Sequence, residues 1–183
     1  MSRPTGLPVV GSKVRLREVT IDDADMLDAW ADDPDVGGAF NAFGTPRSPV
    51  DREALARGPF RSERNGELIV ERLRDDKPVG SVSWHRVSYG PNPGSAAWNM
   101  GISLVPDARG EGLGSEAQRL VADYLLATTE LFRVEASTDV ENIAEQRALE
   151  RAGFVREGLL RGAQERHGHR HDLVNYARLR TDP

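Results

Sequence analysis

The stretch VPDARGEGLGS, residues Val105–Ser115, decides the fold because three alternating glycines follow an arginine in it. Gly110, Gly112 and Gly114 leave the backbone free to turn, so that several N–H groups can point at one anion. A run that is typical of a strand precedes the stretch, and a strongly patterned helix follows it. The helix N-terminus adds partial positive charge at the same place. The stretch therefore predicts a loop that binds a pyrophosphate group.

Three kinds of phosphate-binding loop compete for this stretch. A P-loop ends in Gly-Lys-Ser/Thr, and the stretch contains no lysine. A dinucleotide fingerprint, G-x-G-x-x-G, needs a glycine where Ser115 stands. The third kind, R-x-x-G-x-G before a helix, is matched by Arg109, Gly112 and Gly114. The order strand, loop, helix favours this third kind over a glycine-rich turn without a ligand.

The segments on either side of the loop predict an α/β fold built on a mixed sheet. Downstream, Ala117, Leu120, Val121, Tyr124 and Leu125 form the single apolar stripe of a helix. Strands are expected over Val14–Arg17, Glu67–Leu73, Pro78–Val87, Ala96–Val105, Leu131–Ser137, Phe154–Arg166 and His169–Leu179. Helices are expected between Thr20 and Asp33, near Val50–Arg57, through the apolar stripe, and over Ile143–Ala152. The expected order is β-α-α-β-β-β-α-β-α-β-β.

The composition is that of a globular protein of 183 residues with a formal net charge of −5. Residues 1–12 are expected to form an N-terminal arm, and residues 13–183 a single domain. A mildly acidic chain has no overall attraction for nucleic acid or for an anionic membrane. The absence of cysteine excludes disulfides, thiolate zinc sites and thiol nucleophiles. No apolar run approaches roughly 18 residues and no export signal is evident, so a cytoplasmic location is expected.

Three motifs resemble those of the GCN5-related N-acetyltransferase (GNAT) superfamily, and in particular its ribosomal-protein N-terminal (RimJ/RimL-type) branch. They are VRLREVTIDDAD from Val14, RGEGLGSEA from Arg109, and NIAEQRALERAGFVREGL from Asn142. The resemblance covers residues 13–180. It implies a twisted mixed sheet whose fourth and fifth strands, Ala96–Val105 and Leu131–Ser137, splay apart. Acyl-coenzyme A would lie in the gap between them.

The resemblance also implies which residues hold acetyl-CoA or another acyl-CoA as co-substrate. The pantetheine arm would pair with the open backbone of Ile102, Ser103 and Leu104, as an added strand does. Asn142 would contact the thiol end, and Arg147 would either reach a phosphate or be solvated. The pyrophosphate would rest on the backbone N–H groups of Arg109, Gly110, Glu111, Gly112, Leu113, Gly114 and Ser115.

The usual acid and base positions of this branch are largely vacant in the chain. Asn99 and Gln164 stand where the branch often carries glutamates, and Glu145 stands where it often carries a serine. Near a helix N-terminus, Glu145 would stay ionised at neutral pH and could accept a proton from the attacking amine. Its alternative is a solvated helix glutamate. Glu135, on an expected strand, is a second candidate base, and its alternative is a charge that faces out of the sheet.

The histidines His167, His169 and His171 alternate, as metal ligands on one strand could. Gly168 marks a turn among them and no nearby acidic cluster completes a site, so no metal is expected. Either they form a wall beside an acceptor pocket or they are surface residues.

The resemblance implies an enzyme that moves an acyl group, acetyl or another, from acyl-CoA to a primary amine. The acceptor would be a protein N-terminus or a small molecule, selected by residues 36–66 and 86–95. The alternative, from a different class, is a catalytically weak or inactive acyl-CoA sensor, which the vacant acid and base positions would suit. A homodimer is compatible with the resemblance.

Overall fold

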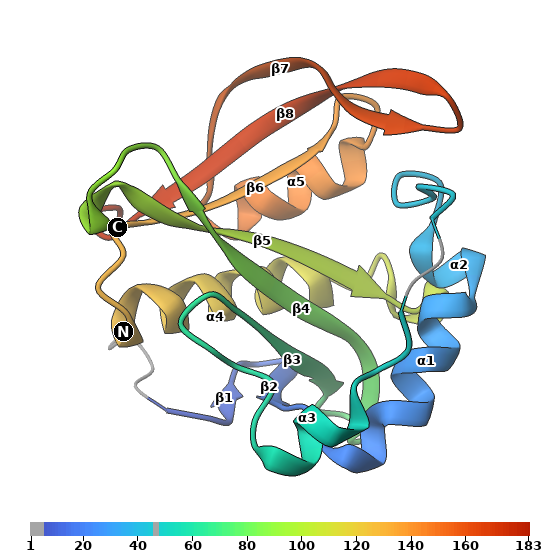
Figure 1. Ribbon diagram of the computed structural model, residues 1–183. Coiled ribbons are helices and arrows are strands. Elements are labelled where there is room, and N and C mark those ends of the chain that lie inside the picture. Colours follow the sequence, from blue (N-terminus) through green and yellow to red (C-terminus); the bar gives the residue numbers. More distant parts are fainter. Residues whose placement is uncertain (1–5, 46–47) are drawn as a thin grey trace.

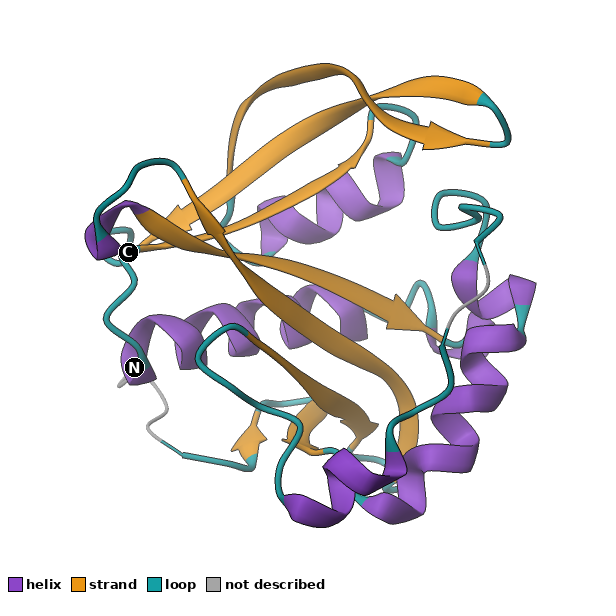
Figure 2. Ribbon diagram, in the orientation of Figure 1, coloured by secondary structure: helices purple, strands orange, loops and turns teal. Residues whose placement is uncertain are grey.

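The structure is a computed structural model that describes residues 6–45 and 48–183. Its strands form one mixed sheet in the order β1-β2-β3-β4-β5-β6-β8-β7, with helices on both faces (Figure 1, Figure 2). The strands are β1 Val9–Val10, β2 Val14–Glu18, β3 Asn65–Arg72, β4 Lys77–Ser88, β5 Ala96–Leu104, β6 Arg133–Asp139, β7 Val155–Arg166 and β8 His169–Leu179. The helices are α1 Ala24–Asp32, α2 Pro34–Gly37, α3 Arg52–Arg57, α4 Leu113–Thr128 and α5 Ile143–Arg151. Short 3₁₀ turns cover Ile21–Asp23, Pro93–Ser95 and Pro106–Ala108.

The expected strands and helices are confirmed, with two additions. Val9 of the expected N-terminal arm pairs with Leu16 and is buried, so the arm contributes β1 to the sheet edge. Residues 1–5 of that arm lie outside the described residues. The second addition is α2, which begins at Pro34 directly after α1 ends. Asp33 caps it by accepting the Asp35 N–H at 2.8 Å, and proline is well suited to a first helical turn.

The pairing between β5 and β6 is the exception in the sheet. It is parallel, whereas the other neighbouring strands pair antiparallel. It is also short, because only Trp98 with Val134 and Asn99 with Glu135 are in register. Beyond these positions the two strands diverge toward α2 (Figure 1). The expected splaying of the two strands, numbered β5 and β6 because β1 is additional, is therefore confirmed.

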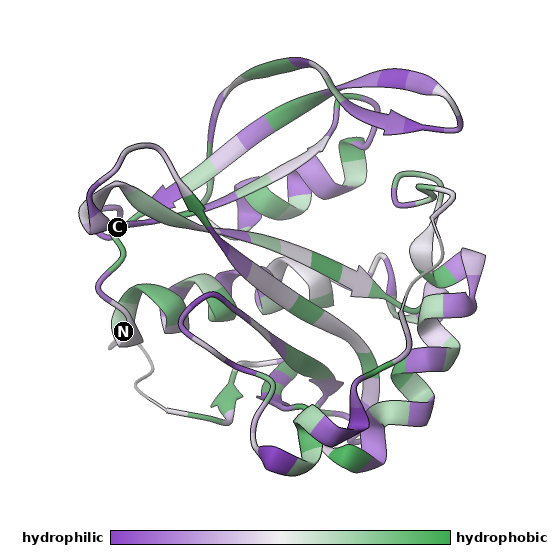
Figure 3. Cartoon of the chain, in the orientation of Figure 1, coloured by the Kyte–Doolittle hydropathy of each residue, from purple (hydrophilic) through white to green (hydrophobic). Residues whose placement is uncertain are grey.

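The main hydrophobic core lies between the sheet and the helices α4 and α5. Its α4 contribution is the apolar stripe expected from the sequence, with Ala117 and Val121 fully buried. Hydrophobic residues run through β4, β5 and α4 in Figure 3, whereas the tip of the β7–β8 hairpin is hydrophilic. No helix within the described residues is long and apolar enough to cross a membrane.

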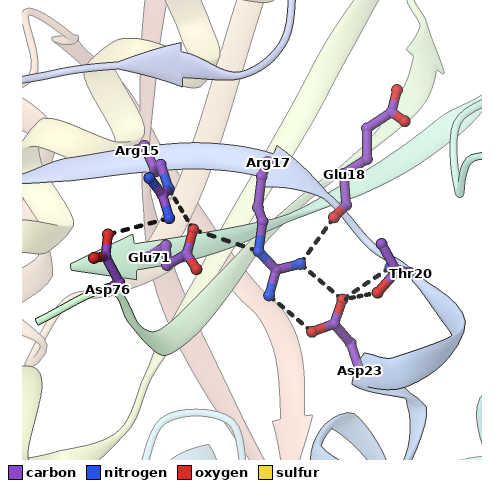
Figure 4. Close-up of polar contacts among 7 residues, drawn as sticks. All are labelled: Arg15, Arg17, Glu18, Thr20, Asp23, Glu71 and Asp76. Atoms are coloured by element: carbon purple, nitrogen blue, oxygen red, sulfur yellow. Dashed lines mark hydrogen bonds and ion pairs between the residues drawn. The ribbon is translucent and has the colours of Figure 1, made fainter. Parts of the chain in front are cut away.

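A polar network fixes the start of α1 against the opposite face of the sheet (Figure 4). Arg17 contacts Asp23 with both terminal nitrogens, at 2.7 and 2.8 Å, and Arg15 contacts Glu71 at 2.5 Å. Burial opposes the charge on Asp23, but the hydrogen bonds from Arg17 and Thr20 outweigh it and hold the pKa of this carboxyl below its ordinary value. The network holds α1, and with it the segment that leads to α2, in a fixed place.

Candidate active site

A cleft of about 610 Å³ opens where β5 and β6 diverge. Its floor is the first half of α4, and its walls are β5 with the loop that follows it on one side and β6 with α5 on the other. Residues 36–41, at the end of α2 and just after it, border its outer end, and Gln164 of β7 reaches it from the hairpin. Segments far apart in the sequence thus meet at one place.

The wall formed by β5 has an open backbone edge. Ile102, Ser103 and Leu104 pair with β4 on one side and line the cleft on the other. Because β6 has already diverged, no strand among the described residues occupies the second side. An extended molecule with amide groups could therefore add to β5 as a strand does.

The glycine loop closes one end of the cleft. Gly110 and Gly112 both have φ of +80°, a left-handed conformation that other residues rarely adopt, and Gly112 is the residue from which α4 begins. Gly114 and Ser115, in the first turn of α4, also line the cleft. The N–H groups of this first turn have no partner within the helix, so the end of the cleft is suited to an anion.

Two of the seven loop residues expected at the pyrophosphate have side chains that turn away from the cleft. Leu113 is buried in the main core. The Glu111 carboxylate contacts Arg74 at 2.8 Å, while its carbonyl oxygen accepts a hydrogen bond from Lys13 Nζ at 2.7 Å. These contacts tie the loop to Lys13, just before β2, and to the β3–β4 turn, and neither Glu111 nor Leu113 lines the cleft.

The Arg109 side chain connects the loop to α2. Its Nη2 donates to the carbonyl oxygens of Asp35, Val36 and Leu104 at 2.6, 2.9 and 2.8 Å. Its Nε donates to Leu104 at 3.0 Å. The guanidinium thus fixes residues 35–36 beside the end of β5, a role that the sequence motif alone did not indicate.

The opposite wall carries two of the expected catalytic residues. Asn142 is the N-cap of α5, and its Oδ1 accepts the Glu145 N–H at 3.2 Å. Both residues line the cleft together with Arg147, whose side chain is exposed. Burial raises the pKa of Glu145 to about 7, and the Gln118 side chain partly opposes that rise. Burial thus opposes the ionised form that was expected for this carboxyl at neutral pH.

The structure does not bring Glu135 into the cleft. Its buried carboxylate accepts hydrogen bonds from Tyr89 at 2.6 Å, Arg133 at 2.9 Å and Asn99 at 3.3 Å. These contacts lie where β5 and β6 are still paired, so Glu135 supports the closed end of the splay. Asn99 serves the same group and is likewise absent from the cleft lining.

The hairpin β7–β8 lines the cleft through Gln164, and its histidines are not part of the lining. Arg166 forms a buried ion pair with Asp139 and donates to the Phe40 carbonyl oxygen at 2.8 Å. His171 lies 3.5 Å from the same aspartate, whereas His167 and His169 are exposed. The described residues include no group of three or more His, Cys, Asp or Glu side chains placed to hold a metal ion.

Sequence reasoning missed Gln118, which lies in the floor of the cleft and is completely buried. The available signal was a polar residue beside the apolar stripe of α4, next to Ala117. It also missed residues 136–139 at the end of β6, because this segment contains no motif. Residues 36–41 border the cleft and belong to the stretch 36–66 that was expected to select the acceptor.

The model of the acetyltransferase (GNAT) domain family matches residues 13–155. The chain belongs to this family. The probable N-acetyltransferase YjcK of Bacillus subtilis is 36% identical over 87 residues, which is 48% of this chain and 46% of that protein. The chain thus matches about half the length of that relative. The N-acetyltransferase p20 of Bacillus licheniformis is 25% identical over 175 residues, or 93% and 94% of the two chains.

Solved structures share the fold over nearly the whole chain. Spermidine N-acetyltransferase from Vibrio cholerae, in complex with CoA and spermine, has a TM-score of 0.75 at 19% identity and covers 94% of this chain and 98% of its own. Mycobacterium smegmatis RimJ, in complex with CoA-disulfide, has a TM-score of 0.70 at 22% identity, with 91% and 81% covered. These likenesses confirm the expected GNAT fold.

Proposed function

We propose that the protein is an acetyl-CoA-dependent N-acetyltransferase whose acceptor is a primary amine. The observation that carries this proposal is one continuous cleft with an anion-binding loop at one end, an open strand edge along its side, and a carboxyl group in its far wall. This order matches the pyrophosphate, the amide-containing arm and the thioester of acetyl-CoA. Family membership and the CoA complexes of similar folds support it.

The residues of the cleft would divide the work in a simple way. Backbone N–H groups around Gly112 and Gly114 would receive the pyrophosphate, and the backbone of Ile102–Leu104 would pair with the arm. A backbone N–H of β5 would polarise the thioester carbonyl. Asn142 would hold the first turn of α5, and with it Glu145, toward the thioester.

Glu145 would be the proton acceptor. The amine nitrogen attacks the carbonyl carbon, a C–N bond forms, and the C–S bond breaks with its electron pair on sulfur. The proton that nitrogen loses goes to the Glu145 carboxylate, directly or through water, and then to the thiolate. A carboxyl group with a pKa of about 7 is suited to both transfers near neutral pH. Glu135 is not proposed as the proton acceptor, because its carboxylate already accepts hydrogen bonds from three side chains.

The acceptor amine belongs to a small polyamine or to a protein N-terminus, the two classes named for similar structures. Residues 36–41, Asp139 and Gln164 line the part of the cleft that such an amine would approach.

The test is thioester consumption with acetyl-CoA against a panel of polyamines and peptides with free N-termini, with mass spectrometry of the products. We expect an acceptor that gains one acetyl group, and Glu145→Gln should lower its rate. The exposed Glu141, on the turn before α5, supplies the matched control Glu141→Gln. Binding of CoA with no acetylated product from any amine would instead support the acyl-CoA sensor.

A further inference from the structure

Gln118 is a buried amide without a partner. It lies on α4 with no exposed surface, and both of its side-chain polar atoms lack a normal hydrogen bond within the described residues. An unpaired amide in such a place destabilises a fold, and native proteins rarely keep one without a purpose. Gln118 lines the cleft, so the missing partner can come from there.

The position of Gln118 relates it to both ends of the proposed reaction. It follows Ser115 by three residues and Gly114 by four, so it lies one helical turn beyond the anion-binding end, on the same side of α4. Gln118 lines the same cleft as Glu145, which lies in the first turn of α5. Two effects act on the pKa of the Glu145 carboxyl: burial raises it, and the Gln118 amide lowers it.

Two of the other charged groups that line the cleft are held by hydrogen bonds or an ion pair, and two are exposed. Arg109 donates to backbone carbonyls, and Asp139 at the end of β6 pairs with Arg166. Arg147 and Arg151 on α5 line the cleft with exposed side chains. The neighbouring β7 contributes the uncharged Gln164.

We propose that Gln118 is the positioning residue for Glu145 and couples it to the bound co-substrate. Its amide nitrogen donates to the ionised Glu145 carboxylate, and its amide oxygen accepts an N–H of the pantetheine arm that lies across the floor. Both polar atoms are then satisfied only when the cleft is loaded. This inference rests on the proposed function, because it gives Glu145 a partner in the same reaction.

The proposal predicts a shift in pH dependence as well as a loss of rate. A donor to the carboxylate stabilises its ionised form, so removal of that donor raises the pKa of Glu145 further above its ordinary value. Gln118→Leu keeps the approximate size and removes both polar atoms. We expect its acidic limb of kcat against pH to move upward by about half a unit or more, with a several-fold higher KM for acetyl-CoA.

The experiment is a double-mutant cycle with Gln118→Leu, Glu145→Gln and the double variant, each checked for folding by circular dichroism. If Gln118 acts through Glu145, Gln118→Leu lowers kcat in the parent but not in the Glu145→Gln background. A ¹³C NMR titration of the glutamate carboxyls, with Glu145 assigned by its absence in Glu145→Gln, measures the same shift without turnover. Gln118→Met replaces Gln118→Leu if the latter does not fold.

The outcomes separate this inference from the proposed function. If Glu145→Gln retains the parent rate and acidic limb, Glu145 is not the proton acceptor. If Glu145→Gln loses the limb but Gln118→Leu keeps both the limb and the NMR titration of the parent, only the role of Gln118 is overturned. A raised KM in Gln118→Leu with an unshifted titration overturns the coupling too, and leaves Gln118 as a contact of the arm alone.

Discussion

Arg109 reaches from the glycine loop to α2 and donates a hydrogen bond to the carbonyl oxygen of Val36 at 2.9 Å. The same nitrogen also binds the Leu104 carbonyl at 2.8 Å, so one guanidinium joins the loop, the end of β5 and the segment that borders the cleft. The arginine of the R-x-x-G-x-G motif therefore shapes the cleft with its side chain, whereas the glycines after it shape the loop with their backbone.

Arg109→Met should loosen residues 35–41 and weaken acetyl-CoA binding by about tenfold or more, because hydrogen bonds worth ~1 kcal/mol each are lost. Isothermal titration calorimetry measures this affinity. The exposed Arg64 provides the control Arg64→Met, whose affinity should equal that of the parent. Equal affinity in Arg109→Met would show that the segment after α2 holds its place without this side chain.

Gly112→Val should abolish measurable acetyl-CoA binding, because a side chain would have to adopt φ of +80° in the anion-binding loop. Its Cβ would also lie 3.2 Å from Lys13 Nζ, the group that holds the loop. Gly168→Val is the matched control, since Gly168 has φ of +78° in the β7–β8 turn with open space around it. Both variants should lose similar stability in thermal unfolding, and only Gly112→Val should lose binding by calorimetry.

Glu145→Gln should lower kcat by about 100-fold while the affinity for CoA remains near that of the parent, because general-base help is typically worth two to four orders of magnitude. The rate of the parent should rise through pH 7 as Glu145 ionises, and the variant should lack this limb. Steady-state rates between pH 5.5 and 9, roughly two units about that pKa, provide the measurement. Glu145→Ser, with the residue commoner in the RimJ/RimL-type branch, should also be impaired unless the amine arrives neutral.

The Glu145 carboxyl should also make the unfolding free energy of the ligand-free protein depend on pH. Its pKa is raised from 4.5 to about 7, so its contribution is fully favourable below 4.5 and is lost as pH rises through 7. Above that pH a buried charge remains, which Glu145→Gln removes. At pH 8 the variant should therefore be more stable than the parent, by up to ~3 kcal/mol in unfolding free energy, and should unfold at a higher temperature. This difference in stability should shrink at pH 5. Differential scanning calorimetry at the two pH values decides this.

Glu116 should show the opposite dependence. Burial raises the pKa of its carboxyl, but hydrogen bonds from the backbone of Ser12, Lys13 and Val14 and from the Ser12 hydroxyl outweigh burial and hold it below 4.5. This stabilisation is present above pH 4.5 and is lost as pH falls through the lowered pKa. Glu116→Gln should thus lose ~1–3 kcal/mol at pH 7 and much less in acid, measured by urea unfolding. An equal loss at both pH values would assign the effect to packing against Gly11.

The long helices and strands could be located from their apolar periodicity, and the glycine loop from its motif, because both signals are local in the sequence. The apolar stripe through Ala117 and Val121 and the turn at Gly168 predicted α4 and the β7–β8 hairpin correctly. The strand at Val9 was missed, because two residues are too short for any periodicity and their pairing with β2 is a tertiary effect.

The candidate site was predictable only in part, because the residues next to a carboxyl in the sequence do not determine its surroundings in the folded protein. Glu135 and Glu145 are both glutamates in patterned elements. The first is surrounded by Tyr89, Arg133 and Asn99, and the second by the walls of a cleft. The burial of Gln118 in the floor of the cleft likewise depends on the packing of α4 against α5 and could not be predicted from the sequence. Such differences depend on burial and on distant partners.

The short seam between β5 and β6 also bears on how long the protein survives. Only two residue positions join the sheet across it, so β1–β5 and β6–β8 rely on α4 and on whatever fills the cleft. A ligand that contacts both sides stabilises the folded form by a free energy that rises with the logarithm of its concentration, and proteases cut chains mainly when they open. We therefore expect the abundance of acetyl-CoA to govern the turnover of the protein, with protein synthesised in a CoA-poor cell degraded faster than its sequence and core would suggest.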